Sequence, residues 1–278
     1  MAPLAAALAL AFPVGGWTQA AHGPDGGTVW TGRIPNTFVA DARPSAVYLP
    51  PGFQPARRYP VVYLLHGMKG SPASIYNGMD LPAAADRLIA GGAPPFIAVL
   101  PVAGPVVHPN SGEWAGAWEN YLVRDVVPWV DAHLPTVPAQ DARALEGLCA
   151  GGFGAMDIGL RHPGVFGTLG SFDGYFAPVF RDGPFVRASQ TDLLDHDPTV
   201  LVARERASLV RHGVRFYVSA GGDHGRIRTS WSTAFAQRLR SLRLPYRLWR
   251  LPESERGHFW RATLPSALAY AAAGFVVS

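Results

Sequence analysis

The sequence is poor in cysteine, lysine and charged residues in general. Its 278 residues include one cysteine, Cys149, so no disulfide can form within the chain and no cysteine-rich metal site can be built. Charged residues make up 16%, against about 25% in an ordinary globular protein. Lys69 is the only lysine and the arginines are scattered. The net charge of +4 therefore indicates a mildly basic surface, with no cluster typical of a nucleic-acid-binding protein.

Metal-binding motifs and long apolar runs are also missing. No H-E-x-x-H or paired-histidine spacing occurs, which argues against a metal hydrolase, and no cofactor is expected. The apolar run Ala5–Val14 is too short to span a bilayer. It resembles the apolar region of a secretory signal, although the usual basic leader is missing, which would fit a start further upstream. We expect residues 1–27 to be signal-like or disordered, residues 28–278 to form the domain, and the protein to be secreted or attached to the cell envelope.

What is abundant is apolar residues, glycine and proline. Hydrophobic residues make up 48%, enough for a sizeable core, and short apolar segments alternate with helix-like ones. This alternation predicts βαβ units and a mostly parallel sheet with helices on both faces, in a single α/β domain. The expected strands are Ala46–Leu49, Val61–Leu65, Phe96–Leu100, Ala144–Leu148, Thr168–Phe172, Arg215–Ser219 and Tyr246–Leu251. The expected helices are Leu81–Ala90, Glu119–His133, Gly152–Arg161, Ser230–Leu242 and Ala262–Ala273.

The most specific motif surrounds Cys149. It reads strand, then Gly147-Leu148-Cys149-Ala150-Gly151-Gly152, then helix, which is the G-x-S-x-G nucleophile elbow with cysteine in place of serine. The glycines remove Cβ atoms that would clash where the chain reverses. The following helix would direct its N-terminal N–H groups at the sulfur. The alternative is a glycine-rich turn that holds a buried structural cysteine.

A second motif predicts the oxyanion hole. The apolar strand in Pro60–Gly67 ends in His66-Gly67, and in hydrolases of this fold the loop after that strand supplies an oxyanion N–H. By position we expect the backbone N–H groups of Met68 and Ala150 to form the hole. We interpret His66 as a structural histidine that holds the loop.

The acid and the base should follow the nucleophile in that order. Asp223 comes just after the strand Arg215–Ser219, and His258 lies in the loop before the last helix. Asp223 would orient His258, and His258 would accept the thiol proton, so that the three residues form a Cys-His-Asp triad.

Other residues compete for these two roles. Asp173 also follows a strand end, and Glu253 and Glu255 lie close to His258 in the sequence. His224 adjoins Asp223, but it comes too early in the chain for the base, and a surface role fits it better.

Aromatic residues suggest an apolar substrate cleft. Trp114, Trp118 and Tyr121 come in a segment that follows a strand end, and Phe176 comes soon after the strand that follows the elbow. Each of them could equally belong to the core. Glu119 is interpreted as a cap or a salt-bridge partner.

Taken together, the motifs resemble the esterase D / antigen 85 mycolyltransferase superfamily of α/β-hydrolases. The resemblance covers roughly residues 28–275 and rests on Tyr48–Phe53, Tyr59–Gly67, Tyr76–Gly78, Gly147–Ala155, Arg161–Pro163, Gly257–Arg261 and Leu264-Pro265. It implies a metal-free carboxylester hydrolase or acyltransferase with Cys149, Asp223 and His258 as its triad and Met68 and Ala150 as oxyanion donors. The family normally has serine as nucleophile, and the cysteine elbow looks like that of dienelactone hydrolases.

Several functions therefore stay open. The first is ester hydrolysis through an acyl-Cys149 intermediate, with a small-molecule or lipid acyl ester as substrate and no nucleic-acid partner. The second is mycolyltransferase-like transfer to a cell-envelope acceptor, or thioester hydrolysis, because a thiol passes its acyl group on readily. The third is a catalytically silent binding protein of the same fold.

Overall fold

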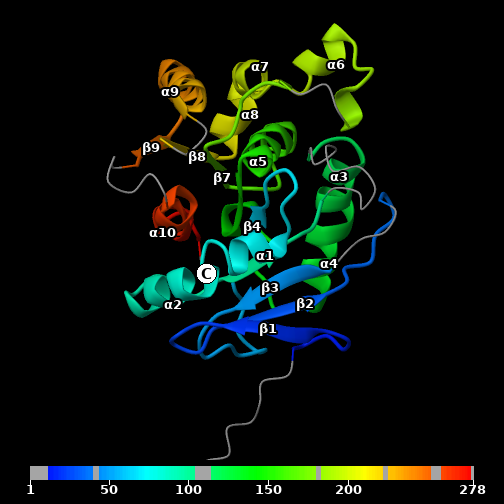
Figure 1. The fold of residues 1–278 in the computed structure, drawn as a ribbon, viewed down its shortest axis with the longest axis vertical. Coiled ribbons are helices and arrows are strands. Elements are labelled where there is room, and N and C mark those ends of the chain that lie inside the picture. Colours follow the sequence, from blue (N-terminus) through cyan, green and yellow to red (C-terminus); the bar gives the residue numbers. More distant parts are fainter. Residues whose placement is uncertain are drawn as a thin grey trace, which may run out of the picture.

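The computed structural model describes residues 12–39, 44–103, 114–179, 183–221, 225–251 and 258–276. Nine strands form one sheet in the order β1-β2-β3-β5-β4-β6-β7-β8-β9 (Figure 1). The strands are β1 (Thr18–His22), β2 (Thr28–Gly32), β3 (Ser45–Leu49), β4 (Val61–Leu65), β5 (Ile97–Leu100), β6 (Arg143–Leu148), β7 (Thr168–Phe172), β8 (Arg215–Ala220) and β9 (Tyr246–Arg250). β1, β2, β3 and β5 pair antiparallel, and every pair from β5 to β9 is parallel. The predicted mostly parallel α/β sheet is confirmed.

The helices lie on both faces of the sheet. They are α1 (Pro72–Tyr76), α2 (Leu81–Ala90), α3 (Ala117–Asn120), α4 (Val127–His133), α5 (Ala150–Arg161), α6 (Gln190–Leu194), α7 (Pro198–Arg204), α8 (Arg206–Arg211), α9 (Gly225–Ser241) and α10 (Phe259–Ala272). A π-helical segment, Tyr121–Val126, joins α3 to α4, and short 3-10 turns occupy Gln140–Ala142 and Gly183–Phe185. No helix among the described residues is long and apolar enough to cross a membrane.

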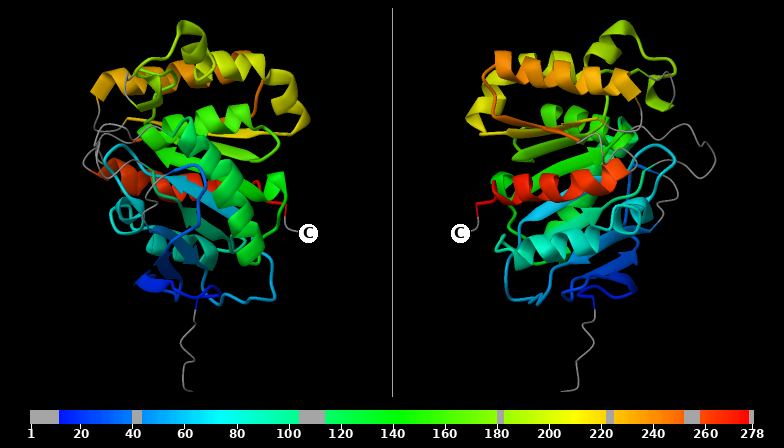
Figure 2. Two further views of the ribbon diagram at one scale, coloured as in Figure 1. Left: turned by 90° about the vertical axis from the view of Figure 1, so that its right-hand side faces the viewer. Right: turned by 60° about the vertical axis from the view of Figure 1, so that its left-hand side comes forward.

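Alternating side chains of the central strands divide the core into two layers. In β4, Val61, Tyr63 and Leu65 pack with α4, α5, α7 and α9, whereas Val62 and Leu64 pack with α2 and α10. α2 and α10 also contact each other on that second face (Figure 2). Because both faces are covered, the central strands are apolar throughout, as continuous runs in the sequence indicated.

All seven predicted strands and all five predicted helices are present, with end positions that differ by a few residues. The sequence reading missed β1, β2 and the short helices α1, α6, α7 and α8. We expected the domain to begin at residue 28, but β1 lies before that residue and pairs with β2. The folded part therefore starts earlier than the predicted boundary. Whether residues 1–27 include a signal stays a prediction.

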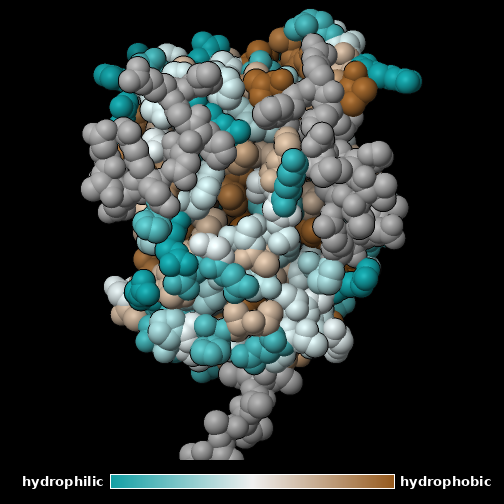
Figure 3. Space-filling model, viewed as in Figure 1, coloured by the Kyte–Doolittle hydropathy of each residue, from teal (hydrophilic) through white to brown (hydrophobic). Residues whose placement is uncertain are grey.

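The surface differs between the two ends of the molecule. Figure 3 shows hydrophobic residues at the end that carries α6–α9 and mostly hydrophilic ones at the end that carries β1–β3. Among the described residues, most of the exposed large hydrophobic side chains lie in the segment 179–210. They are Val179, Val186, Leu194, Val200 and Val210.

Candidate active site

Cys149 lies at a sharp turn between β6 and α5. Its backbone has φ 55° and ψ −115°, a conformation that a side chain larger than glycine rarely adopts and that is common at functional turns. The Cys149 N–H donates to the carbonyl of Phe172 at 3.0 Å, and its own carbonyl accepts the Phe153 N–H at 3.1 Å. The thiol is partly exposed. The strand–turn–helix context predicted for the elbow is therefore present.

The glycines of the elbow are required by close backbone contacts. A Cβ atom at Gly147 would clash with the carbonyl group of Gly151, and one at Gly151 would clash with the carbonyl group of Leu65. A Cβ atom at Gly152 would lie 2.7 Å from the hydroxyl oxygen of Ser171. These glycines let the first turn of α5 approach the ends of β4 and β6, so that the helix N-terminus lies directly behind Cys149.

The loop after β4 runs against this elbow. A Cβ atom at Gly67 would lie 3.2 Å from the Cβ of Cys149. The Gly70 N–H donates to the Gly67 carbonyl at 2.9 Å, which closes a turn that contains Met68 and Lys69. Neither the Met68 N–H nor the Ala150 N–H donates to an acceptor within the described part of the chain. The Ala150 N–H follows Cys149 directly in the sequence. The Met68 N–H belongs to the loop that contacts Cys149 at Gly67.

His66 holds the loop from inside, as predicted. Its Nδ1 lies 2.8 Å from the Gly67 carbonyl oxygen, and its Nε2 accepts the Ala103 N–H at 3.0 Å. These two contacts fix the tautomer with the proton on Nδ1. Since both ring nitrogens are used and the ring is buried, His66 is a structural residue.

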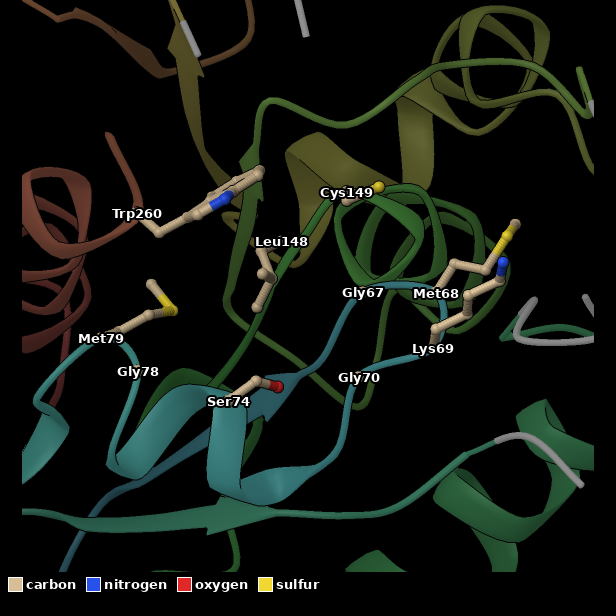
Figure 4. A pocket seen from close by; sticks show the side chains of 10 residues that line it. All are labelled: Gly67, Met68, Lys69, Gly70, Ser74, Gly78, Met79, Leu148, Cys149 and Trp260. Atoms are coloured by element: carbon tan, nitrogen blue, oxygen red, sulfur yellow. The ribbon is translucent and has the colours of Figure 1, made fainter. Parts of the chain in front are cut away.

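A cavity of about 330 Å³ opens beside Cys149. Figure 4 shows Met68 and Lys69 extending from adjacent positions on one side of the thiol and Trp260 on the other, with Met79 below Trp260. The remaining lining residues are Gly67, Gly70, Ser74, Gly78 and Leu148. These described lining residues are mainly apolar and include no carboxylate, and the cavity is large enough for a short acyl group.

An arginine contacts the thiol directly. Nη1 of Arg228, in the first turns of α9, lies 3.0 Å from the sulfur of Cys149 and donates to the carbonyl of Asp173 at 3.1 Å. Its guanidinium carbon lies 5.8 Å from the centre of the Tyr175 ring. A guanidinium at this position favours negative charge on the sulfur. The sequence reading missed Arg228, because the arginines are scattered and no motif marks this one.

Comparison with known proteins identifies the family. Residues 39–270 match the family described as putative esterase. The chain belongs to this esterase family.

Individual proteins similar to parts of the chain include a named esterase. Over 134 residues the chain is 34% identical to Esterase Rv1288 of Mycobacterium tuberculosis H37Rv, a stretch that is 46% of this chain and 28% of that protein. It is 29% identical over 119 residues, 42% of this chain and 38% of the other, to the MPT51/MPB51 antigen of Mycobacterium bovis. The chain thus spans well under half the length of these relatives. A solved ferulic acid esterase has the same fold, with a TM-score of 0.78 at 22% identity, covering 90% of this chain and 99% of that one.

The structure describes one of the two predicted partners of Cys149. His258 immediately precedes α10, its side chain is exposed, and Trp260 two positions later lines the cavity. No hydrogen bond joins His258 to Cys149 within the described residues. Asp223 and the alternatives Glu253, Glu255 and His224 lie outside the described residues. Among the described residues no group of three His, Cys, Asp or Glu side chains could hold a metal ion.

The four aromatic residues expected in the substrate cleft do not line the cavity. Trp114 is fully buried and its Nε1 donates to the His66 carbonyl at 3.0 Å. Tyr121 is also fully buried, and Trp118 packs edge-on against it. Phe176 is buried and stacks on Phe235 with ring centroids 4.1 Å apart. These aromatic side chains pack in the core around the site, which is the alternative that the sequence left open for each of them.

The salt-bridge role expected for Glu119 is confirmed. Its Oε1 accepts hydrogen bonds from Arg161 Nε at 3.0 Å and His162 Nε2 at 2.8 Å. Burial alone would raise the pKa of Glu119, but these two partners outweigh it and hold the pKa below its ordinary value. The cluster links α3 to the C-terminal end of α5, away from the thiol.

Proposed function

We propose that the protein is a carboxylester hydrolase that acts through a covalent acyl–Cys149 intermediate. The observation that carries the proposal is the position of the thiol, which lies at the start of α5, partly exposed, beside a mainly apolar cavity. A buried structural cysteine would need neither the strained backbone of this turn nor the open cavity. Membership of the esterase family supports the same activity.

In the proposed reaction His258 accepts the thiol proton and the sulfur attacks the ester carbonyl carbon. The C–S bond forms, the C–O bond breaks, and His258 returns the proton to the departing alkoxide. Water then attacks the thioester and gives a proton to His258. The C–S bond breaks, the carboxylic acid leaves, and the thiolate regains its proton. Asp223 would orient the imidazole throughout.

The N–H groups of Met68 and Ala150 would stabilise the oxyanion of both tetrahedral intermediates. Their positions on either side of Cys149 support this role, as does the lack of another acceptor among the described residues. The dipole of α5 adds positive potential at the same point.

Hydrolysis of p-nitrophenyl esters of increasing acyl length tests the proposal. We expect the wild-type protein to release p-nitrophenol and Cys149→Ala to lose this activity. Ser241→Ala, an exposed substitution on α9, is the matched control and should leave the rate unchanged. Equal rates for Cys149→Ala and the wild type would contradict the proposal.

Acyl transfer is the second candidate, and the match to the MPT51/MPB51 antigen favours it, given the resemblance to mycolyltransferases. The acyl group on Cys149 would pass to a hydroxyl of a cell-envelope acceptor in place of water. Export or envelope association of the protein is part of this proposal. Addition of alcohol or sugar acceptors to the ester assay should then yield new esters at the expense of the free acid.

A further inference from the structure

We infer that Arg228 binds a carboxylate on the acyl group, so that the preferred substrates are esters whose acyl part is a dicarboxylic acid with one free end. The inference rests on the proposed function and names its substrate class. It starts from the contact between Arg228 Nη1 and the Cys149 sulfur at 3.0 Å. Any acyl group carried on that sulfur must lie within reach of the same guanidinium.

Within the described residues, the charged side chains that contact the thiol or line its cavity are both cations, Arg228 and Lys69. No ion pair joins Arg228 to a carboxylate of the described residues, where its oxygen partner is the backbone carbonyl of Asp173. Lys69, the only lysine of the chain, lines the same cavity and has no ion pair within the described residues either. No acidic side chain is found among the described residues that line the cavity. A partly buried cation that has no carboxylate partner among the described residues is suited to an anionic ligand.

The chemical step explains when this ligand would be needed. Before attack, the guanidinium can stabilise negative charge on the sulfur. Once the thioester forms, the sulfur is neutral and Arg228 loses that partner. A carboxylate on the acyl chain would replace it, and a guanidinium binds a carboxylate through two parallel N–H···O bonds where an ammonium offers a point charge. The interaction would therefore stabilise the acyl-enzyme and the transition states that flank it.

Two substrates that differ only at the far end of the acyl chain give the test. One is mono-p-nitrophenyl adipate, which carries a free carboxylate, and the other is p-nitrophenyl heptanoate, which is neutral and of similar length. We expect the wild type to have the higher kcat/KM for the adipate. Arg228→Gln should lower the ratio of the two kcat/KM values by about 10- to 100-fold, the usual effect of losing a charged hydrogen bond. Arg228→Lys should retain part of the preference.

Controls separate this inference from other roles of Arg228. Arg211→Gln, on the exposed side of α8, should leave the ratio unchanged, and thermal melting verifies that each variant is folded. If Arg228→Gln lowers both kcat/KM values equally, the residue only activates the thiol, and the inference is wrong while the hydrolase proposal stands. If the wild type hydrolyses neither ester, the hydrolase proposal and the inference both fail.

Discussion

Two ionisable side chains, one within β6 and one just after its end, have opposite surroundings. Cys149, at the carboxyl end of β6, is partly exposed and contacts a guanidinium. Glu146, within β6, is fully buried between the sheet and α10, and neither of its carboxylate oxygens has a hydrogen-bond partner among the described residues. It lies over Gly170, which pairs with it on β7 and has no side chain to occupy the space.

The difference shows what the strand end provides. Burial raises the pKa of Glu146 to about 8, so this group is neutral at pH 7. At the end of the strand, solvent, the α5 N-terminus and Arg228 all favour negative charge on the sulfur. A nucleophile must be able to carry negative charge, and the turn at Cys149 allows this where the buried position of Glu146 does not. The predictions below first test the surroundings of Cys149 and then the burial of Glu146.

The largest effect is expected from removing the proposed base. His258→Ala should lower kcat/KM for p-nitrophenyl esters by about 100- to 10,000-fold, because no other group would transfer the proton. Iodoacetamide should still alkylate Cys149, since the guanidinium contact is unaffected. The control is His212→Ala at an exposed position after α8. A loss of less than tenfold for His258→Ala would contradict the assignment of the base.

A smaller effect should follow from disturbing the elbow. Gly151→Ala places a Cβ atom against the Leu65 carbonyl group and 2.7 Å from the His66 carbonyl oxygen. Urea unfolding should show a loss of about 2–3 kcal/mol in the free energy of unfolding. Gly164→Ala is the control, because its Cβ atom would meet its nearest neighbour, His212, at 3.5 Å. Equal stability of the two variants would mean that the elbow can shift without cost.

The last effect concerns Glu146 and is seen only as the pH is raised. Its pKa in the folded state lies above the ordinary value of 4.5, so the folded protein holds this proton more tightly than the unfolded chain. The stabilisation is complete below about pH 4.5 and is lost as the pH rises toward 8, by about 1.4 kcal/mol for each pH unit at most. Glu146→Gln should lack this decline. Denaturant titrations of both proteins between pH 5 and 8 measure the difference, and parallel curves would contradict it.

The fold was largely predictable because the central strands are continuous apolar runs between glycines and prolines. β1 and β2 were missed because Thr18–His22 is mostly exposed and Thr28–Gly32 has only two apolar residues between threonines and a glycine, so neither gives a continuous apolar signal. The elbow and the structural role of His66 could be found from the sequence, since glycine spacing and strand ends define them.

The cavity could not be predicted in the same way. Trp114 and Tyr121 looked like cleft residues, but the fold turns both into the core. Trp260 lines the cavity from α10 and Arg228 contacts the thiol from α9, elements far from the elbow in the sequence. Which side of a helix an aromatic or an arginine takes depends on tertiary packing, and no local pattern encodes it.

The most direct test of the central claim is to trap the acyl-enzyme. The protein is mixed with p-nitrophenyl butyrate, quenched in acid within the first turnovers, and digested for mass spectrometry. We predict that the peptide containing Cys149 gains the mass of one butyryl group, and that Cys149→Ala gains none. A wild-type protein that releases p-nitrophenol while this peptide stays unmodified, or a butyryl group on another residue, would contradict the claim that Cys149 is the nucleophile.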